Sequence, residues 1–186
     1  MKTKTSAAVW AAFALVPALA AGAAAAQDAD STGFYGSAGY ALIDPRGAAS
    51  KDLGAVNLRA GYQFNRYLGV EAEGAVGVDD ARLTGPGVRG SYGLDYSIGA
   101  YGVARYPVTE RFDVFARAGV VHAKFKGKGQ VGTTVARFSD KDEYFAIGAG
   151  AQFNIDRKNG IRADYTRFEG DGLDANVWGL SFVRKF

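Results

Sequence analysis

Residues that could act as acids, bases or nucleophiles are few in this chain of 186 residues. It has one histidine, His122, and no cysteine, which excludes thiolate chemistry and a transition-metal cluster of histidines and cysteines. A serine hydrolase needs a serine beside its histidine, and Ser139-Asp140 could approach His122 only by folding back. A non-catalytic histidine is the simpler interpretation.

The carboxylates offer two further possibilities. Glu71 and Glu73 are two positions apart, so on a strand they share a face, as paired catalytic carboxylates would. They fit equally well into a network of buried charges. Asp79-Asp80, and Asp140 with Asp142 and Glu143, could hold a hard cation, although solvated loop charge is the usual explanation. We therefore predict no cofactor, no bound metal and no enzymatic activity.

The stretch that positions Glu71 and Glu73 runs from Val56 to Val78 and alternates between apolar and polar or small residues. Successive side chains of a strand point to opposite faces, so the pattern predicts a hairpin with one apolar and one charged face. Each arm has about ten residues, the length that a tilted strand needs to cross a bilayer.

The rest of the chain repeats this design. Long connections alternate with short ones, among which 79–92 and 126–142 are predicted as long loops. Such a pattern is typical of an all-β, eight-stranded antiparallel up-and-down transmembrane β-barrel, with short periplasmic turns and longer outer loops. The predicted strands are 33–43, 56–64, 68–78, 93–106, 112–124, 143–153, 160–168 and 175–186.

A period of two does not say which face looks inward. A soluble, lipocalin-like barrel would hold its apolar face inside. Here the polar face carries charges in mid-strand, and the aromatics of the apolar face gather at two levels, as in the girdles of membrane barrels. This favours an apolar face toward lipid. The two aromatic groups are Tyr62, Phe64, Tyr106, Phe112, Phe153, Phe182 and Phe186 near the short turns, and Tyr40, Tyr96, Phe145, Tyr165 and Trp178 toward the long loops.

The inward face then collects nearly equal numbers of acidic and basic side chains. An eight-stranded barrel has an interior just wide enough for its own side chains, so we expect these charges to interlock as ion pairs and plug a polar lumen. The alternative is a narrow or gated channel for small solutes that uses the same charges. The predicted lumen network is Arg59, Glu71, Glu73, Asp95, Arg105, Asp113, Arg117, Arg162 and Asp164.

The first 26 residues predict a secretory signal peptide. Lys2 and Lys4 precede an apolar region, and a run of small residues ends at Ala26, after which we expect cleavage. The alternative is an N-terminal membrane anchor. Residues 27–186 then form the barrel domain. The formal charge of +3 falls to about +1 without the two lysines, so no nucleic-acid partner is implied.

Three segments give the chain a family resemblance: Gly33–Tyr40, Gly61–Glu71 and Gly148–Phe153. They resemble the outer-membrane β-barrel family, which includes opacity-like surface antigens, small "porin family" proteins and the OmpA-type N-terminal barrel. The resemblance implies the outer membrane of a Gram-negative bacterium, contact with its lipid, and the barrel-assembly machinery as a partner. It also implies an assembly signal in the last strand, from which Arg184 departs, formed by Trp178, Leu180, Phe182 and Phe186.

Lys124, Lys126 and Lys128 lie where the outer rim is expected, at the level of lipopolysaccharide phosphates. Contact with lipopolysaccharide is one interpretation and a solvated basic rim is the other. We predict a monomer with a structural or surface-interaction role, whose outer loops meet a host or envelope partner. The channel is the first alternative. A lipid A-modifying enzyme is the second, and the lack of a serine near His122 in sequence argues against it.

Overall fold

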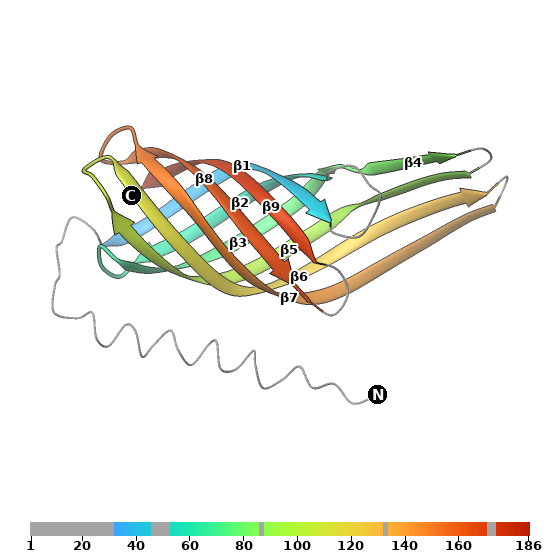
Figure 1. Ribbon diagram of the computed structural model, residues 1–186, viewed down its shortest axis with the longest axis horizontal. Helices are drawn as coiled ribbons and strands as arrows, with labels where there is room; N and C mark the ends of the chain where they lie inside the picture. The colour runs from blue at the N-terminus through green and yellow to red at the C-terminus, as the bar shows by residue number, and fades with distance from the viewer. Residues whose placement is uncertain (1–31, 46–52, 86–87, 132–133, 171–173) are drawn as a thin grey trace, which may run out of the picture.

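The computed structural model describes residues 32–45, 53–85, 88–131, 134–170 and 174–186, and these residues form one antiparallel sheet (Figure 1). No helix that could span a membrane occurs in these ranges. The strands are β1 (Gly33–Pro45), β2 (Leu53–Gln63), β3 (Leu68–Asp79), β4 (Ala81–Gly85), β5 (Val88–Pro107), β6 (Phe112–Val131), β7 (Thr134–Asn154), β8 (Asn159–Glu169) and β9 (Ala175–Lys185).

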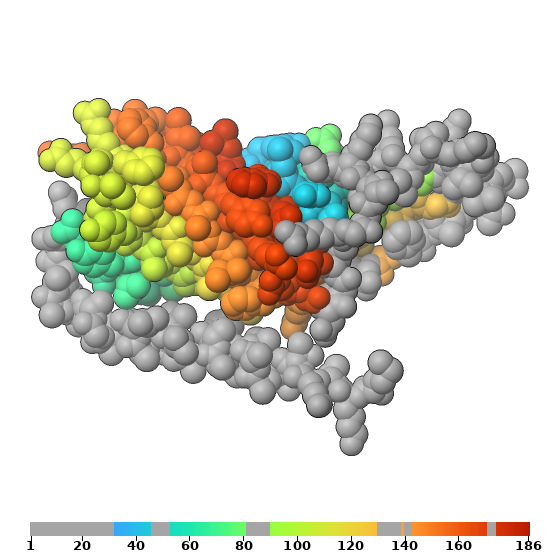
Figure 2. Space-filling view, in the orientation of Figure 1, coloured from blue at the N-terminus to red at the C-terminus, as the bar shows by residue number. Residues whose placement is uncertain are grey.

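The sheet closes on itself because β1 pairs with both β2 and β9. The short β4 follows β3 after Asp80, and both pair with β5, so that they serve as one wall strand. The predicted fold class, an eight-stranded antiparallel barrel, is confirmed. Figure 2 shows β8 and β9, in orange and red, packed side by side in its wall.

The two faces of the strands have opposite character. On β2, Asn57 and Arg59 are 2% and 5% exposed, whereas Val56 and Leu58 are 41% and 63% exposed. A soluble protein buries its apolar side chains and exposes its charges. The reverse arrangement places the apolar face toward lipid, which excludes the soluble, lipocalin-like alternative.

The predicted long loops 79–92 and 126–142 are largely strand, which corrects the sequence prediction. β6 runs on to Val131 and pairs with β7, while β4 and β5 form a second hairpin beside it. Both hairpins project beyond the barrel at the end away from the short turns (Figure 1). Polar strands are stable there because neighbouring backbones satisfy each other's hydrogen bonds, whatever the side chains.

The interior is not polar throughout, which is a second correction. Toward the projecting hairpins it is filled by an apolar layer, within which Phe125 stacks on Tyr92 at 5.5 Å between ring centroids and meets the edge of Tyr144 at 6.5 Å. The sequence pattern does not reveal this layer, because the strands that carry buried charges also carry these residues on the same face. The buried members are Ala41, Ile43, Leu53, Ala55, Leu94, Tyr101, Val121, Ala123, Phe125, Tyr144, Ala146, Phe168, Ala175 and Val177.

The seam between β1 and β9 depends on close backbone approach at Gly39. A Cβ added there would lie 2.3 Å from the carbonyl oxygen of Leu180 and 2.7 Å from the Cα of Ser181. We expect Gly39→Ala to destabilise the barrel by about 1–3 kcal/mol, because the seam must shift to admit a methyl group. Gly74→Ala is the matched control, since no atom lies within 4 Å of its added Cβ. Equal urea midpoints for the two variants would contradict this account of the seam.

Candidate functional site

Six charged side chains from four strands meet in the barrel interior. The exposed fraction of each is 10% or less. Their charges cancel, with three guanidinium groups against three carboxylates. We call this group the ionic cluster: Arg59 from β2, Glu71 and Glu73 from β3, Arg117 from β6, and Arg162 and Asp164 from β8.

Arg59 and Arg117 link the two sides of the ionic cluster. Arg59 donates to both carboxylate oxygens of Asp164, at 2.8 and 3.0 Å, and also to Glu73. Arg117 Nη1 donates to Glu73 Oε2 at 2.9 Å, and its Nη2 lies 3.4 Å from Asp164 Oδ2. Each of these two carboxylates is thus shared by two arginines, which fixes the cluster across the lumen.

Arg162 occupies the most enclosed position, with a fully buried side chain. It donates to Glu71, which also accepts a hydrogen bond from Tyr35 Oη at 2.7 Å. The guanidinium carbon of Arg162 lies 3.8 Å from the ring centroid of Phe115, a cation–π contact. Arg162 therefore has both a counter-ion and an aromatic surface in place of water.

Two uncharged residues that bind the ionic cluster were not identified from the sequence. Tyr35 binds Glu71, and Thr166 Oγ1 accepts hydrogen bonds from Arg117 Nε at 3.1 Å and Nη2 at 2.7 Å. Both residues share the inward face of their strands with buried polar residues. The alternation of inward and outward positions along these strands could therefore have identified both residues.

Arg105 and Asp113 form a separate pair nearer the short turns. Their Nη1 and Oδ2 atoms are 3.3 Å apart, and Asn154 donates to the same Asp113 oxygen at 3.0 Å. Gln152 in turn donates to Asn154 at 2.8 Å. The structure thus splits the predicted network into the ionic cluster and this smaller group.

Asp95 was predicted to face the lumen, and the structure corrects this. The β5–β6 register shifts between Leu94 and Tyr96, so a bulge turns Leu94 inward and leaves Asp95 at the outer surface. A single extra residue inverts the facing of every side chain beyond it. Asp95 instead meets Lys124 at 2.9 Å and Lys126 at 3.8 Å.

The rim lysines share the outward face of β6. Lys126 and Lys128 are exposed and Lys124 is half-buried, in alternation with the buried Ala123 and Phe125. Because Asp95 lies beside Lys124 and Lys126, part of the charge of these two lysines is already balanced.

Among the residues whose side chains the structure describes, no serine lies beside His122. It lies on the outward face of β6 opposite Ile98 and Glu143, whereas Ser97, the nearest serine across that pair of strands, is buried on the inner face. Ser139 pairs with Lys126, four residues beyond the His122–Glu143 position, or about 13 Å along the strand. Among the described residues, no group of histidines and acidic side chains is suited to hold a metal ion.

The predicted assembly signal comprises three residues on the outward face of β9 and Phe186, which follows the strand. Trp178, Leu180, Phe182 and Phe186 are 59%, 61%, 49% and 76% exposed, so lipid meets all of them. The predicted signal peptide, residues 1–26, lies outside the described residues.

A model of the outer membrane protein beta-barrel domain matches residues 11–186 of the chain. The chain belongs to this outer-membrane β-barrel family. The outward apolar face thus meets the lipid of the outer membrane of a Gram-negative bacterium. No curated protein sequence matches the chain.

Solved structures support the same assignment. The attachment invasion locus protein Ail of Yersinia pestis is 25% identical, with 83% of this chain and 99% of that chain covered and a TM-score of 0.57. Ail solved with the heparin analogue sucrose octasulfate is 24% identical over the same coverage, with a TM-score of 0.60. Neisserial surface protein A shares the fold at 14% identity, covering 82% of this chain and 97% of that chain, with a TM-score of 0.59.

Proposed function

We propose that the protein is a closed outer-membrane barrel that acts at the cell surface, with a lumen plugged by its own side chains. The observation that carries the proposal is the neutral ionic cluster, whose six charges bind one another across the lumen. The apolar layer adds a second barrier, since a hydrophobic constriction resists wetting. A solute would have to break the ionic cluster and then cross the apolar layer.

Bilayer conductance tests the closed lumen. We expect purified wild-type protein in planar bilayers to give no steady ion current above that of a protein-free membrane. A double variant, Phe125→Ala and Tyr144→Ala, removes two aromatic rings from the apolar layer. A current that appears only in this variant would show that the apolar layer blocks the lumen. Steady wild-type current would favour the narrow or gated channel instead.

A surface-interaction role is supported by the two projecting hairpins and the outward lysines. The hairpins carry strand structure well beyond the barrel, where a host or envelope partner would meet them. Ail, one of the proteins similar to this chain, was solved with a sulfated heparin analogue. Lys124, Lys126 and Lys128 offer this barrel a basic surface at the same end, which suits the phosphates of lipopolysaccharide.

Changing these lysines should weaken the binding of lipopolysaccharide. K124Q/K126Q/K128Q is expected to lose about 1 kcal/mol per exposed lysine in a lipopolysaccharide titration of the detergent-solubilised barrel. Asp95→Asn should act in the opposite direction, because it removes the carboxylate 2.9 Å from Lys124. If both changes leave the affinity unaltered, the lysines form only a solvated rim.

We infer that residues 1–26 are removed on export. We also infer that the assembly machinery reads the outward face of β9 together with Phe186, because these four large apolar side chains are all accessible. We also infer that the barrel is a monomer and not an enzyme. The outward position of His122, away from the inward-facing Ser97, supports the last point. Mass spectrometry of lipid A incubated with the barrel tests it.

A further inference from the structure

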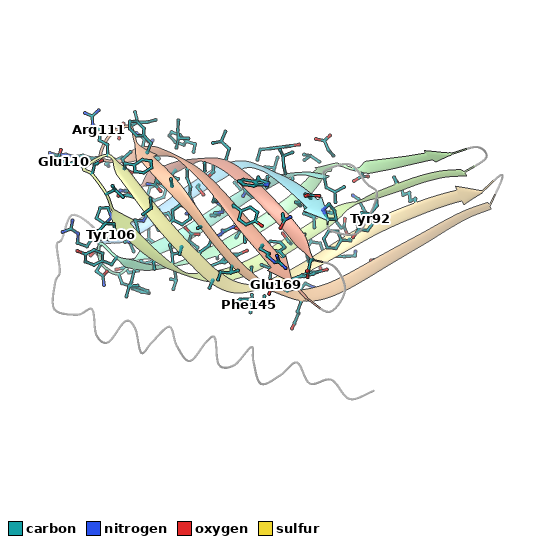
Figure 3. The ribbon with its side chains drawn as sticks, viewed as in Figure 1. Tyr92, Tyr106, Glu110, Arg111, Phe145 and Glu169 are labelled. Carbon is teal, nitrogen blue, oxygen red and sulfur yellow. The ribbon has the colours of Figure 1, made fainter. Side chains whose placement is uncertain are left out.

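Basic residues gather at the short-turn end of the barrel, opposite the rim lysines. Arg111 closes the β5–β6 turn, Arg157 and Lys158 lie in the β7–β8 turn, and Arg184 lies near the end of β9. We call these four residues the basic arc. All four are exposed. Figure 3 shows Arg111 at this end of the molecule, beyond the strands.

Two backbone hydrogen bonds make the basic arc continuous. Asn154 N donates to Arg111 O at 2.7 Å, which joins the β5–β6 turn to the end of β7. Lys185 N donates to Lys158 O, also at 2.7 Å, which joins the β7–β8 turn to β9. Arg184 also lies opposite Asn159 in the β8–β9 register. The four cations thus follow one stretch of the rim.

The acidic residues nearby balance only part of the charge of the basic arc. Asp156 accepts hydrogen bonds from the backbone amides of Lys158 and Asn159 at 2.7 and 2.8 Å, and from the Asn159 side chain. Those bonds, the Asn159 side chain first among them, and the nearby charge of Arg184 hold the pKa of Asp156 below its ordinary value. Glu110 is the other acid of these turns, so the rim keeps a net positive charge. Within the ranges that the structure describes, no ion pair binds the side chains of the basic arc.

An apolar row lies beside the basic arc on the lipid face. Phe153 of β7 pairs with Ile161 of β8, which pairs with Phe182 of β9. These three side chains are 48%, 47% and 49% exposed. Together, the arc and the row place cations at the membrane surface and apolar contacts one step deeper.

We propose that the basic arc and the apolar row bind anionic phospholipids of the periplasmic leaflet, with the headgroup phosphate on the arc and the acyl chains along the row. The short turns of outer-membrane barrels face the periplasm, so the lipid on this side is phospholipid. Guanidinium groups bind phosphate oxygens through two parallel hydrogen bonds. Long basic side chains near an interface extend to the headgroups while their stems stay on apolar surface.

Spin-labelled lipids test the proposal directly. In phosphatidylcholine bilayers, we expect the wild-type barrel to hold labelled phosphatidylglycerol about five-fold more strongly than labelled phosphatidylcholine, the factor given by one basic residue at an anionic surface. R157Q/K158Q/R184Q should bring this ratio close to one. R157K/R184K keeps the charges and should retain most of the preference. Added salt should lower the wild-type ratio.

The matched control is Glu110→Gln, which removes a negative charge from the same turns and should raise the ratio. Heat-modifiable mobility on gels verifies that each variant is folded. An unaltered ratio in the R157Q/K158Q/R184Q variant would overturn the proposal, and so would a ratio that Glu110→Gln lowers. Loss of retention on sedimented peptidoglycan with an unchanged lipid ratio would assign the basic arc to a wall polymer instead.

Discussion

Replacing Arg162 by leucine should lower the free energy of unfolding by about 3–5 kcal/mol, because it leaves Glu71 buried without its main counter-ion. Glu71 is 3% exposed, so water cannot take over the role of the guanidinium. Urea unfolding in lipid bilayers, followed by the fluorescence of Trp178, measures the loss.

The control for Arg162→Leu is Arg157→Leu, the same chemical change in an exposed turn, for which we expect less than about 0.5 kcal/mol. The double variant Glu71→Gln with Arg162→Leu should recover part of the loss, since it removes the unpaired charge as well. A double-mutant cycle then gives the coupling free energy between Glu71 and Arg162. If Arg162→Leu were as mild as Arg157→Leu, the ionic cluster would not exist in the membrane.

Replacing Ala72 by arginine should cost about 2–4 kcal/mol, the range for a basic side chain at the bilayer midplane on the lipid face of a barrel. Ala72 is exposed on that face and lies opposite Ala60 and Ala100 of the neighbouring strands. No counter-charge or water would meet the new guanidinium there. The same urea titration detects the change.

Val78→Arg provides the depth control for Ala72→Arg. Val78 is 53% exposed on the same face of β3, six residues closer to the outer end. An arginine near the interface can extend its side chain to water, so we expect about 0–1 kcal/mol. A larger loss for Val78→Arg than for Ala72→Arg would show that the membrane crosses the barrel at another level.

The alternation of side chains between the two faces of a strand accounts for most of what could be predicted from the sequence. Arg59, Glu71 and Glu73 occupy the polar faces of β2 and β3, and the structure places all three inside. The alternation holds because each strand meets lipid on one side and other side chains on the other, so a slip by one residue would invert both faces. This constraint acts on single strands and needs no knowledge of their neighbours.

Features that depend on neighbouring strands could not be predicted in the same way. The bulge at Asp95 is visible only in the pairing of β5 with β6, and nothing in the strand itself marks the change of parity. The apolar layer could not be predicted for a related reason. Val121 and Phe125 share the inward face of β6 with Arg117, and only the barrel as a whole assigns them to different depths. The length of the projecting hairpins likewise depends on pairing between strands that look like polar loops.

The β1–β9 seam has a consequence for the order of events in biogenesis. It sets Gly36 opposite Arg184, 148 positions later, while the other wall strands pair with close neighbours in the chain. Hairpins can therefore form early, yet no cylinder exists before β9 arrives, and contacts this distant in sequence slow folding. A translocation-stalled fragment without β9 carries an edge whose amides and carbonyls hydrocarbon cannot satisfy. Such a fragment is unstable within the bilayer, so we expect the barrel to insert only when β9 is available to pair with β1.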